Sequence, residues 1–390
     1  MGKLCEWAPN PYVGTNPHWD SLVRDYLAAE DIEEVIEQLP GYRPTPVYRL
    51  AGLARKLGIG DLWVKDESER FGLQAFKGLG VAYAVYKVLQ QYPEGADITF
   101  TTATDGNHGR ALAWAARLFG KKAVIFVPKT VTPDRIRNIE KEGATVFVVD
   151  AVYDEVVQYA AEQAKKHGWV VVQDTAWEGY TEVPAWIMAG YLMMFRELED
   201  SLHLPEKPAV DVVILQAGVG SWAAAAVWYY VTRYGENRPK FVLVEPTEAD
   251  CFLASIRAGE ATASSGSIDS IMAGLNCGVP SMLAWPILKN WVDVFMTVSD
   301  EYAAEAMRQY YFPQPGDPRI IAGESGAAGL AALLVMNKEP HFAEVREFLG
   351  AETAAFLTFN TEGITDPANF RRIVGELPEL VSSGDLPAAS

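Results

Sequence analysis

Residues 66–89 read DESERFGLQAFKGLGVAYAVYKVL, and the rest of the chain is organised around this stretch. The strand LWVKDE, residues 62–67, runs into a short turn that delivers Lys77, and we expect a helix to begin at Gly78. Lys77 would then lie at the positive end of a helix dipole, behind two aromatic residues, Phe71 and Phe76. Burial and a nearby positive end both disfavour an ammonium group, so we expect the pKa of Lys77 to be lowered.

A deprotonated lysine is a nucleophile toward aldehydes. This is the first requirement for holding a cofactor such as pyridoxal phosphate as a Schiff base. The alternative is a solvated lysine in the first turn of a helix, since lysine is common near helix ends and is mostly exposed. This stretch alone leaves both interpretations open.

Composition limits the classes of function. The chain has 390 residues, which suggests two domains or one large α/β unit. Its 33 basic and 51 acidic residues give a net charge of −18, which argues against nucleic acid or an anionic membrane as a partner and fits a cytoplasmic protein. The N-terminus has no apolar core of signal-peptide length, and no apolar run reaches membrane-spanning length.

The cysteines and histidines do not suggest a metal site. Cys5, Cys251 and Cys277 form no CxxC motif, and the five histidines are scattered without a close pair. We therefore expect no metal. The cysteines are expected to be reduced thiols, although a bridge between Cys251 and Cys277 stays open.

Apolar strands alternate with helices along most of the chain, which indicates an α/β fold with a mostly parallel sheet covered on both faces. Ligands in such folds lie outside the carboxyl ends of the strands, so the turns after strands matter most. We expect one domain to be inserted within the other. The expected elements include helices at 19–27, 32–37, 51–57 and 155–166, strands at 122–128 and 169–174, an irregular loop at 259–285 and a frayed tail after Leu380.

The turn GVGSWA, residues 218–223, follows a strand and precedes a helix. It matches the dinucleotide fingerprint GxGxxA, and Glu245 ends the next strand at about the right distance to hold a ribose. The same turn equally suits a single phosphate, because backbone N–H groups and the helix N-terminus supply the donors. A tight turn without a ligand is the third interpretation.

Two further turns after strands carry polar groups. In TDGNHG, residues 104–109, glycines let the backbone approach a ligand and Asn107 could donate to a ring oxygen, or could serve only an Asx-turn. We interpret His108 as a packing residue. In QDTAWEGY, residues 173–180, a carboxylate such as Asp174 could act as a general acid or hold a cation, or could cap a helix.

Together these pieces resemble the fold-type II pyridoxal-phosphate-dependent lyases, and among them the diaminopropionate ammonia-lyase family. The resemblance covers about residues 40–375. It rests, in chain order, on KDESERFGLQAFK, TATDGNHGRALAWAA, VVQDTAWEGYT, LQAGVGS, VEPTEADC, IMAGLNCG, DPRIIAGESGAAGL and NTEGITD. It implies two domains, each with a mostly parallel sheet flanked by helices. Residues 1–80 and 190–390 would form the large cofactor-binding domain, and residues 81–189 the small domain inserted within it.

The resemblance also implies roles for particular residues. Lys77 would carry the cofactor as a Schiff base, and Asn107 would contact its ring oxygen. The other implied roles are a phosphate cradle (Gly218, Val219, Gly220 and Ser221), a pyridine-nitrogen contact (Thr361 or Asn360), acidic groups acting on the substrate (Asp105 and Asp174), and substrate contacts (Thr104 and Tyr153). Two departures weaken this transfer: Trp222-Ala223-Ala224-Ala225 stands where the family often has more glycine, and related lyases usually have Ser or Thr at the position of Asn360.

The reaction implied is the α,β-elimination of ammonia from D- or L-2,3-diaminopropionate, which gives pyruvate and two ammonia through 2-aminoacrylate. A carboxylate at Asp105 would suit a substrate with a second ammonium, and bases on both faces, Lys77 and Asp105, would allow both enantiomers. A serine/threonine dehydratase or a related β-elimination enzyme is the nearest alternative. An NAD-dependent oxidoreductase that uses GVGSWA, and a non-catalytic binding relative, are alternatives from other classes. By resemblance we expect a homodimer that acts on a small amino acid.

Overall fold

The computed structural model describes residues 3–15, 21–202, 208–376 and 378. Its strands are β1 (Trp7–Pro9), β2 (Val47–Arg49), β3 (Asp61–Asp66), β4 (Thr99–Ala103), β5 (Lys122–Pro128), β6 (Thr145–Val149), β7 (Val170–Val171), β8 (Val212–Gln216), β9 (Lys240–Pro246), β10 (Val294–Val298) and β11 (Ala355–Asn360).

The helices lie between these strands. The α-helices are α1 (Ser21–Leu27), α2 (Ile32–Glu37), α3 (Ala51–Leu57), α4 (Gly78–Leu89), α5 (Asn107–Leu118), α6 (Pro133–Glu140), α7 (Tyr153–His167), α8 (Glu182–Leu202), α9 (Ser221–Tyr234), α10 (Cys251–Ala258), α11 (Ala284–Trp291), α12 (Asp300–Tyr311), α13 (Ala328–Lys338), α14 (Ala343–Leu349) and α15 (Pro367–Val374). Short 3-10 turns are η1 (Arg70–Gly72), η2 (Gly235–Asn237), η3 (Ala273–Leu275) and η4 (Pro340–Phe342).

The strands form two sheets. The larger has seven strands in the order β1-β10-β9-β8-β11-β3-β2, and the smaller has four in the order β6-β5-β4-β7. Neighbouring strands are parallel except at the two edges of the larger sheet, where β1 and β2 pair antiparallel with β10 and β3. The predicted α/β class with mostly parallel sheets is confirmed.

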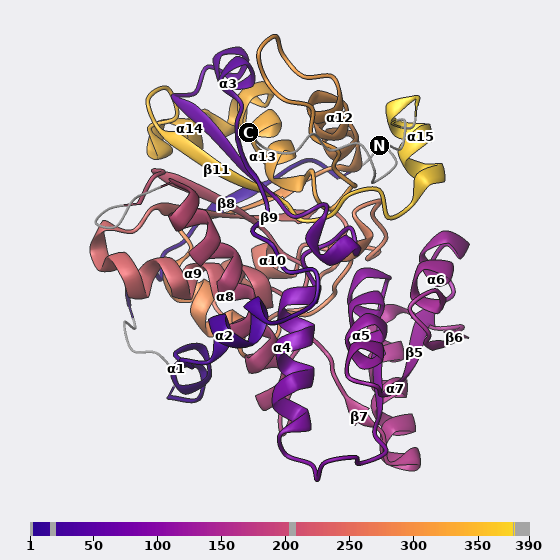
Figure 1. Ribbon diagram of the computed structural model, residues 1–390. Helices are drawn as coiled ribbons and strands as arrows, with labels where there is room; N and C mark the ends of the chain where they lie inside the picture. The colour runs from indigo at the N-terminus through magenta and orange to yellow at the C-terminus, as the bar shows by residue number, and fades with distance from the viewer. Residues whose placement is uncertain (1–2, 16–20, 203–207, 377, 379–390) are drawn as a thin grey trace, which may run out of the picture.

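Helices cover both faces of the larger sheet, because its central strands are apolar on both sides. In β8, Val213 and Leu215 join the core that contains α4, α8 and α9, whereas Val212 and Ile214 join the core that contains α3, α12 and α13. In Figure 1 the smaller sheet lies with α5, α6 and α7 at the lower right, beside α4, and the strands β8, β9 and β11 occupy the upper body.

The domain boundaries stay a prediction. The four strands of the smaller sheet all fall within the predicted inserted segment, residues 81–189, and β8–β11 with β1–β3 fall outside it. Helix α4 begins just before that segment at Gly78 and packs against α8, so it joins the two regions. Among the described residues, no helix combines the length and the apolar character needed to span a bilayer.

Most predicted elements agree with the structure, and the differences are local. The helices predicted at 32–37 and 51–57 and the strand at 122–128 are confirmed at the same bounds. The helix predicted at 155–166 is longer, and the strand predicted at 169–174 covers only Val170–Val171. Helix α11 begins within the segment 259–285 that was predicted to be irregular, so that prediction is wrong at its end. The predicted helix at 19–27 is described only from Ser21, and the predicted frayed tail lies outside the described residues.

Candidate active site

A pocket lies at the carboxyl ends of β4, β8 and β11. It is lined by the turns that follow these strands, together with Lys77 and a loop from the segment 274–277. The lining includes nearly all the predicted site residues: Lys77, Thr104, Asp105, Asn107, Tyr153, Asp174, Gly218, Val219, Gly220, Ser221 and Thr361. The predicted position of a ligand outside the strand ends is where this pocket lies.

Lys77 is paired with a carboxylate. Its Nζ lies 2.5 Å from Oδ2 of Asp174, and both side chains are largely buried. The same carboxylate oxygen lies 3.6 Å from Nδ1 of His108, whose Nε2 contacts the backbone oxygen of Val172 at 2.8 Å. Because a carbonyl oxygen can only accept a hydrogen bond, Nε2 carries a proton, and Nδ1 faces Asp174. His108, interpreted from sequence as a packing residue, therefore also lines the pocket beside Asp174.

The predicted direction of the Lys77 pKa is wrong. Burial does act to lower the pKa of Lys77, but the Asp174 carboxylate more than reverses this and raises the pKa above its usual range. Burial likewise acts to raise the pKa of Asp174, and the Lys77 ammonium and His108 bring it down to about 2. Lysine and aspartate are therefore both charged in this state, because a close ion pair outweighs the desolvation of either group.

Asp105 behaves in the opposite way. Burial raises the pKa of Asp105 to about 7, with Arg135 opposing the rise and Asp174 adding to it. Arg135 on α6 is 5% exposed, and its Nη1 donates to the backbone oxygen of Asp105 at 3.3 Å. A carboxyl group with a pKa near 7 can both accept and donate a proton at neutral pH, which is the property a general acid–base needs.

The turn at residues 218–221 is built so that its backbone faces the pocket. Gly220 has φ +90°, and a Cβ there would lie 2.4 Å from Cζ of Phe252. A Cβ on Gly218 would lie 2.9 Å from Sγ of Cys277. Helix α9 starts at Ser221, so the first N–H groups of the helix have no intrahelical acceptor. Such an N-terminus favours an anion, and a phosphate in particular.

Asn107 begins α5 directly after Gly106, whose φ is +144°. Its Nδ2 donates to Oε2 of Glu362, and Oε1 of Glu362 accepts from the backbone N–H of Ser325 at 3.0 Å. One amide hydrogen of Asn107 is thus used to fix its orientation. The second hydrogen stays available to a ligand in the pocket, because an amide nitrogen has two donors.

The two candidates for the pyridine-nitrogen contact, Asn360 and Thr361, are separated by the structure. Thr361 lines the pocket, and its Oγ1 accepts from Nε2 of Gln216 at 3.1 Å. Asn360 is fully buried and is not among the residues that line the pocket; its Nδ2 donates to Asp66 at 2.8 Å and to the oxygen of Ile321 at 3.0 Å. Successive side chains along an extended segment point to opposite sides, so only one of the two can face the pocket.

Comparison with known proteins agrees with this geometry. The model of the family described as "Pyridoxal-phosphate dependent enzyme" matches residues 38–345 of this chain. The chain belongs to the pyridoxal-phosphate dependent enzymes. It is 42% identical to the diaminopropionate ammonia-lyase of Escherichia coli (strain K12) over 87% of this chain and 89% of that protein. It is 40% identical to the diaminopropionate ammonia-lyase of Salmonella typhimurium over the same shares of the two chains.

A solved structure supports the same grouping within the pyridoxal-phosphate dependent enzymes. The chain is similar, with TM-score 0.85 and 39% identity, to the crystal structure of diaminopropionate ammonia lyase from Escherichia coli in complex with an aminoacrylate-PLP azomethine reaction intermediate. The match covers 95% of this chain and 97% of that one. The predicted fold type, enzyme class and cofactor are confirmed, and this chain groups with the diaminopropionate ammonia-lyases of the family.

The NAD interpretation of GVGSWA is not supported. Glu245 does not line the pocket; it is 1% exposed, and its carboxylate accepts the backbone N–H groups of Phe252 and Leu253 at 2.8 and 2.9 Å. It thus caps helix α10 instead of facing the turn at residues 218–221. Burial raises the pKa of Glu245 to about 8. The group has a structural role as a cap on α10.

The remaining predicted contacts have identifiable geometry. Oγ1 of Thr104 accepts the backbone N–H groups of Gly106 and Gly109 at 2.9 and 3.0 Å, which fixes the turn that presents Asp105. The hydroxyl of Tyr153 accepts from Nε2 of Gln173 at 2.9 Å. The hydroxyl of Ser221 donates to the backbone oxygen of Asp174 at 2.6 Å, so it orients the turn that carries Asp174.

Sequence reasoning gave no role to four residues that line the pocket: Arg135, Gln216, Cys277 and Glu362. Glu362 lies in the turn after β11, which the strand-end rule does indicate, although the rule assigns no role to an individual residue. Arg135 comes from the first turn of a helix and carried no motif. Cys277 is free, as are Cys5 and Cys251, so the open possibility of a Cys251–Cys277 bridge is wrong. Among the described residues no cluster of metal-binding side chains is present, so nothing there points to a metal.

Proposed function

We propose that this protein catalyses the α,β-elimination of ammonia from 2,3-diaminopropionate, which yields pyruvate and two ammonia. The observation that carries the proposal is one pocket that contains Asp105 together with the ion pair of Lys77 and Asp174, whose atoms lie 2.5 Å apart. The close relatives, which are named diaminopropionate ammonia-lyases and match over nearly nine-tenths of the chain, support the same reaction.

The residues present fit pyridoxal phosphate. Lys77 would attach the cofactor, the backbone of residues 218–221 would hold its phosphate, Asn107 would contact its ring oxygen, and Thr361 would contact its ring nitrogen. A Cβ at Gly218 or Gly220 would lie too close to neighbouring atoms, so both positions need glycine. Together with the start of the 14-residue helix α9, they make the phosphate position specific. When bound, the cofactor supplies an electron sink that stabilises negative charge at the substrate Cα.

Asp174 would hold the ammonium group of the substrate. Its carboxylate is ionised at any pH above about 2 and already binds one ammonium, that of Lys77. A second cation can take the place of Lys77 without a new desolvation of Asp174, because the carboxylate is buried in either case. This favours a diamine over a substrate with a β-hydroxyl.

Lys77 and Asp105 would move protons at the substrate. An amine at Lys77 can take the Cα proton from one face, and Oδ of Asp105 can take it from the other. The pKa of Asp105, about 7, suits a group that first accepts a proton and then donates it to the leaving amine. Bases from two sides would allow D and L enantiomers to react.

The surrounding contacts serve orientation. Thr104 holds the turn of Asp105, Glu362 holds Asn107, and Tyr153 closes the side of the pocket next to Asp105. Asp105, Arg135 and Tyr153 also line a larger cleft of about 870 Å³, through which a small amino acid can reach the pocket. The acidic composition and the resemblance support a cytoplasmic homodimer that binds no nucleic acid and no membrane.

Product stoichiometry tests this proposal. The protein, supplied with pyridoxal phosphate, would receive DL-2,3-diaminopropionate and, separately, L-serine, and ammonia would be counted against pyruvate. We expect two ammonia per pyruvate from the diamine and little product from serine. One ammonia per pyruvate from serine, with little from the diamine, would make the protein a dehydratase and remove the role of Asp105.

A further inference from the structure

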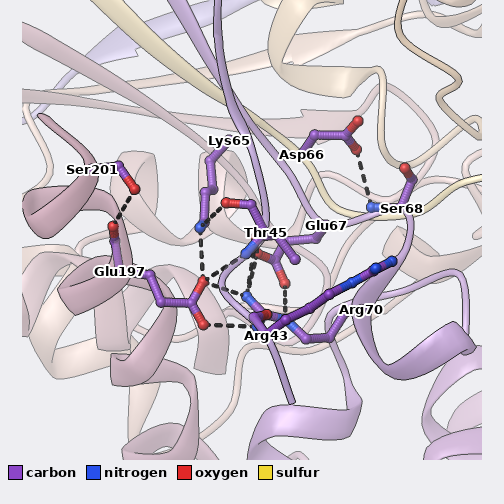
Figure 2. A network of polar contacts seen from close by, with 9 residues as sticks. All are labelled: Arg43, Thr45, Lys65, Asp66, Glu67, Ser68, Arg70, Glu197 and Ser201. Carbon is purple, nitrogen blue, oxygen red and sulfur yellow. Dashed lines mark hydrogen bonds and ion pairs between the residues drawn. The ribbon is translucent and has the colours of Figure 1, made fainter. Parts of the chain in front are cut away.

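Four charged side chains form a closed, buried cluster next to the segment that carries Lys77. Figure 2 shows Lys65, Glu67, Arg70 and Glu197 pointing toward one another, with Thr45 between them. All four are at most 3% exposed, and the two positive and two negative charges balance. Every member comes from the strand β3, the turn that follows it, or helix α8.

The cluster satisfies nearly every donor and acceptor it contains. Arg70 binds Glu67 through Nε and Nη2, both at 2.8 Å, and binds Glu197 through Nη1 and Nη2, both at 2.7 Å. Lys65 donates to Glu197 and to the backbone oxygen of Thr45, both at 2.8 Å. Burial opposes the charge on Arg70, but the two carboxylates more than reverse this and raise the pKa of Arg70. Such planar, two-pronged pairing is specific to arginine.

The chain between Arg70 and Lys77 is held in a strained conformation. Phe71 and Gln74 have φ of +53° and +59°, although neither is glycine. Phe71 stacks on Trp114 with ring centroids 4.8 Å apart, and Gln74 accepts the N–H of Gly363 through its backbone oxygen at 2.9 Å. Residues in such conformations persist only where the surroundings fix them, and they concentrate at functional sites.

Helix α8 is the common support of this segment. Near the C-terminal end of α8, Glu197 binds Arg70. Nearer its start, α8 approaches α4 closely. A Cβ on Gly80 would lie 2.5 Å from the oxygen of Ile187, and one on Gly190 would lie 2.6 Å from the oxygen of Leu79. Between these contacts, Tyr191 of α8 packs against Phe76 with ring centroids 4.9 Å apart. Lys77 therefore lies on a segment fixed to one helix on both sides.

We propose that Lys65, Glu67, Arg70 and Glu197 are positioning residues that set the place of Lys77 in the pocket, a role that rests on the proposed function of Lys77. The cluster does not touch the pocket, and none of its members lines it. It acts through the strained turn, because a looser Arg70 would let Phe71 and Gln74 relax and carry Lys77 away from Asp174. Replacing a buried ion cluster with apolar groups can leave stability unchanged, so its effect on Lys77 can be separated from its effect on folding.

The test measures how fast Lys77 captures pyridoxal phosphate. The holoenzyme would be stripped of cofactor and mixed with fresh cofactor, and the visible absorbance of the lysine-bound form would be followed in time. The variants are Arg70→Lys, which keeps the charge and loses the two-pronged geometry, and Lys65→Met with Glu197→Met, which removes one ion pair, leaves Arg70 bound to Glu67 and frees Arg70 from α8. The control is Arg238→Met with Asp293→Asn, which disrupts another largely buried ion pair, of 2.7 Å, that does not line the pocket.

We expect both cluster variants to capture the cofactor about tenfold more slowly. This factor corresponds to the strain energy of about one residue. The control variant should capture at the rate of the unaltered protein even if its unfolding midpoint falls further. Hydrogen exchange should become faster in residues 71–77 of the cluster variants alone. Wild-type capture rates in Arg70→Lys, or equal slowing in the control, would overturn the proposal. If the double variant does not fold, Arg70→Lys decides alone. Failure of the unaltered protein to bind the cofactor would instead refute the proposed function.

Discussion

The ion pair between Lys77 and Asp174 predicts that removing the carboxylate will free the lysine. In Asp174→Asn the attraction that raises the pKa of Lys77 is lost, and burial, which acts to lower it, remains. The pKa of Asp174 falls from 3.8 to about 2 in the pair, which corresponds to about 2.4 kcal/mol at about 1.36 kcal/mol per pKa unit. His108 and a backbone hydrogen bond also lower the pKa of Asp174, and burial raises it, so this figure gives only the order of the attraction from Lys77.

Coupling between two charges is mutual, so the substitution should lower the pKa of Lys77 by a similar amount. At a pH well below that pKa, the fraction of neutral amine should rise by about 60-fold. Competitive labelling of the cofactor-free protein with acetic anhydride, read by mass spectrometry, measures this fraction. The exposed Lys122 in the same sample is the internal reference, and Asp293→Asn is the matched control because it removes a different carboxylate from an ion pair. Equal labelling of Lys77 in Asp174→Asn and in the unaltered protein would refute the reasoning.

The pocket supports four further predictions. Asp105→Asn should reduce kcat/KM for one enantiomer of diaminopropionate far more than for the other, and equal losses would contradict bases on two faces. The folded pKa of Asp105 is raised from 3.8 to about 7, so between these pH values the folded protein binds one more proton than the unfolded chain. The unaltered protein should therefore lose stability as pH rises through this window. Asp105→Asn should not show this loss, and urea unfolding at several pH values compares the two. Gly220→Ala should abolish tight binding of pyridoxal phosphate, whereas Gly316→Ala, at the same φ of +90° with no atom within 4 Å of the new Cβ, should not; cofactor titration compares them. Pyridoxal phosphate at a hundredfold excess over its Kd should stabilise the folded protein by about 2.7 kcal/mol and raise its Tm. A Tm that is the same with and without the cofactor would argue against a site that forms only on folding.

The sequence predicted the sheet and the turns well because their signals are local. KAVIFVP, residues 122–128, is apolar enough to form a buried strand in any arrangement. Helix α11 was missed, although Pro286 lies in its first turn and Ile287, Leu288 and Trp291 repeat at helical spacing. The preceding run of glycine and serine hid that period. The strand at 169–174 was overestimated because its last residues form the turn that carries Asp174 into the pocket.

The site was predicted in outline, and its electrostatics were not. Local sequence shows that Lys77 is buried at a helix start, which acts to lower its pKa, but Asp174 is 97 residues away and only the fold reveals the pair. The same holds for Arg135 beside Asp105 and for Glu362 beside Asn107, which come from different turns. The choice between Asn360 and Thr361 depended on which way one strand end points, and a sequence alone does not fix that direction.

The buried cluster around Arg70 has a consequence for how this protein can change over evolution. Removing one charge from it leaves an opposite charge buried without a partner, which is costly, whereas removing a balanced pair is tolerated. The positions 65, 67, 70 and 197 should therefore covary among homologues, with loss of a cation accompanied by loss of an anion. Lineages in which one member alone has changed should be rare, even though none of the four side chains lines the pocket.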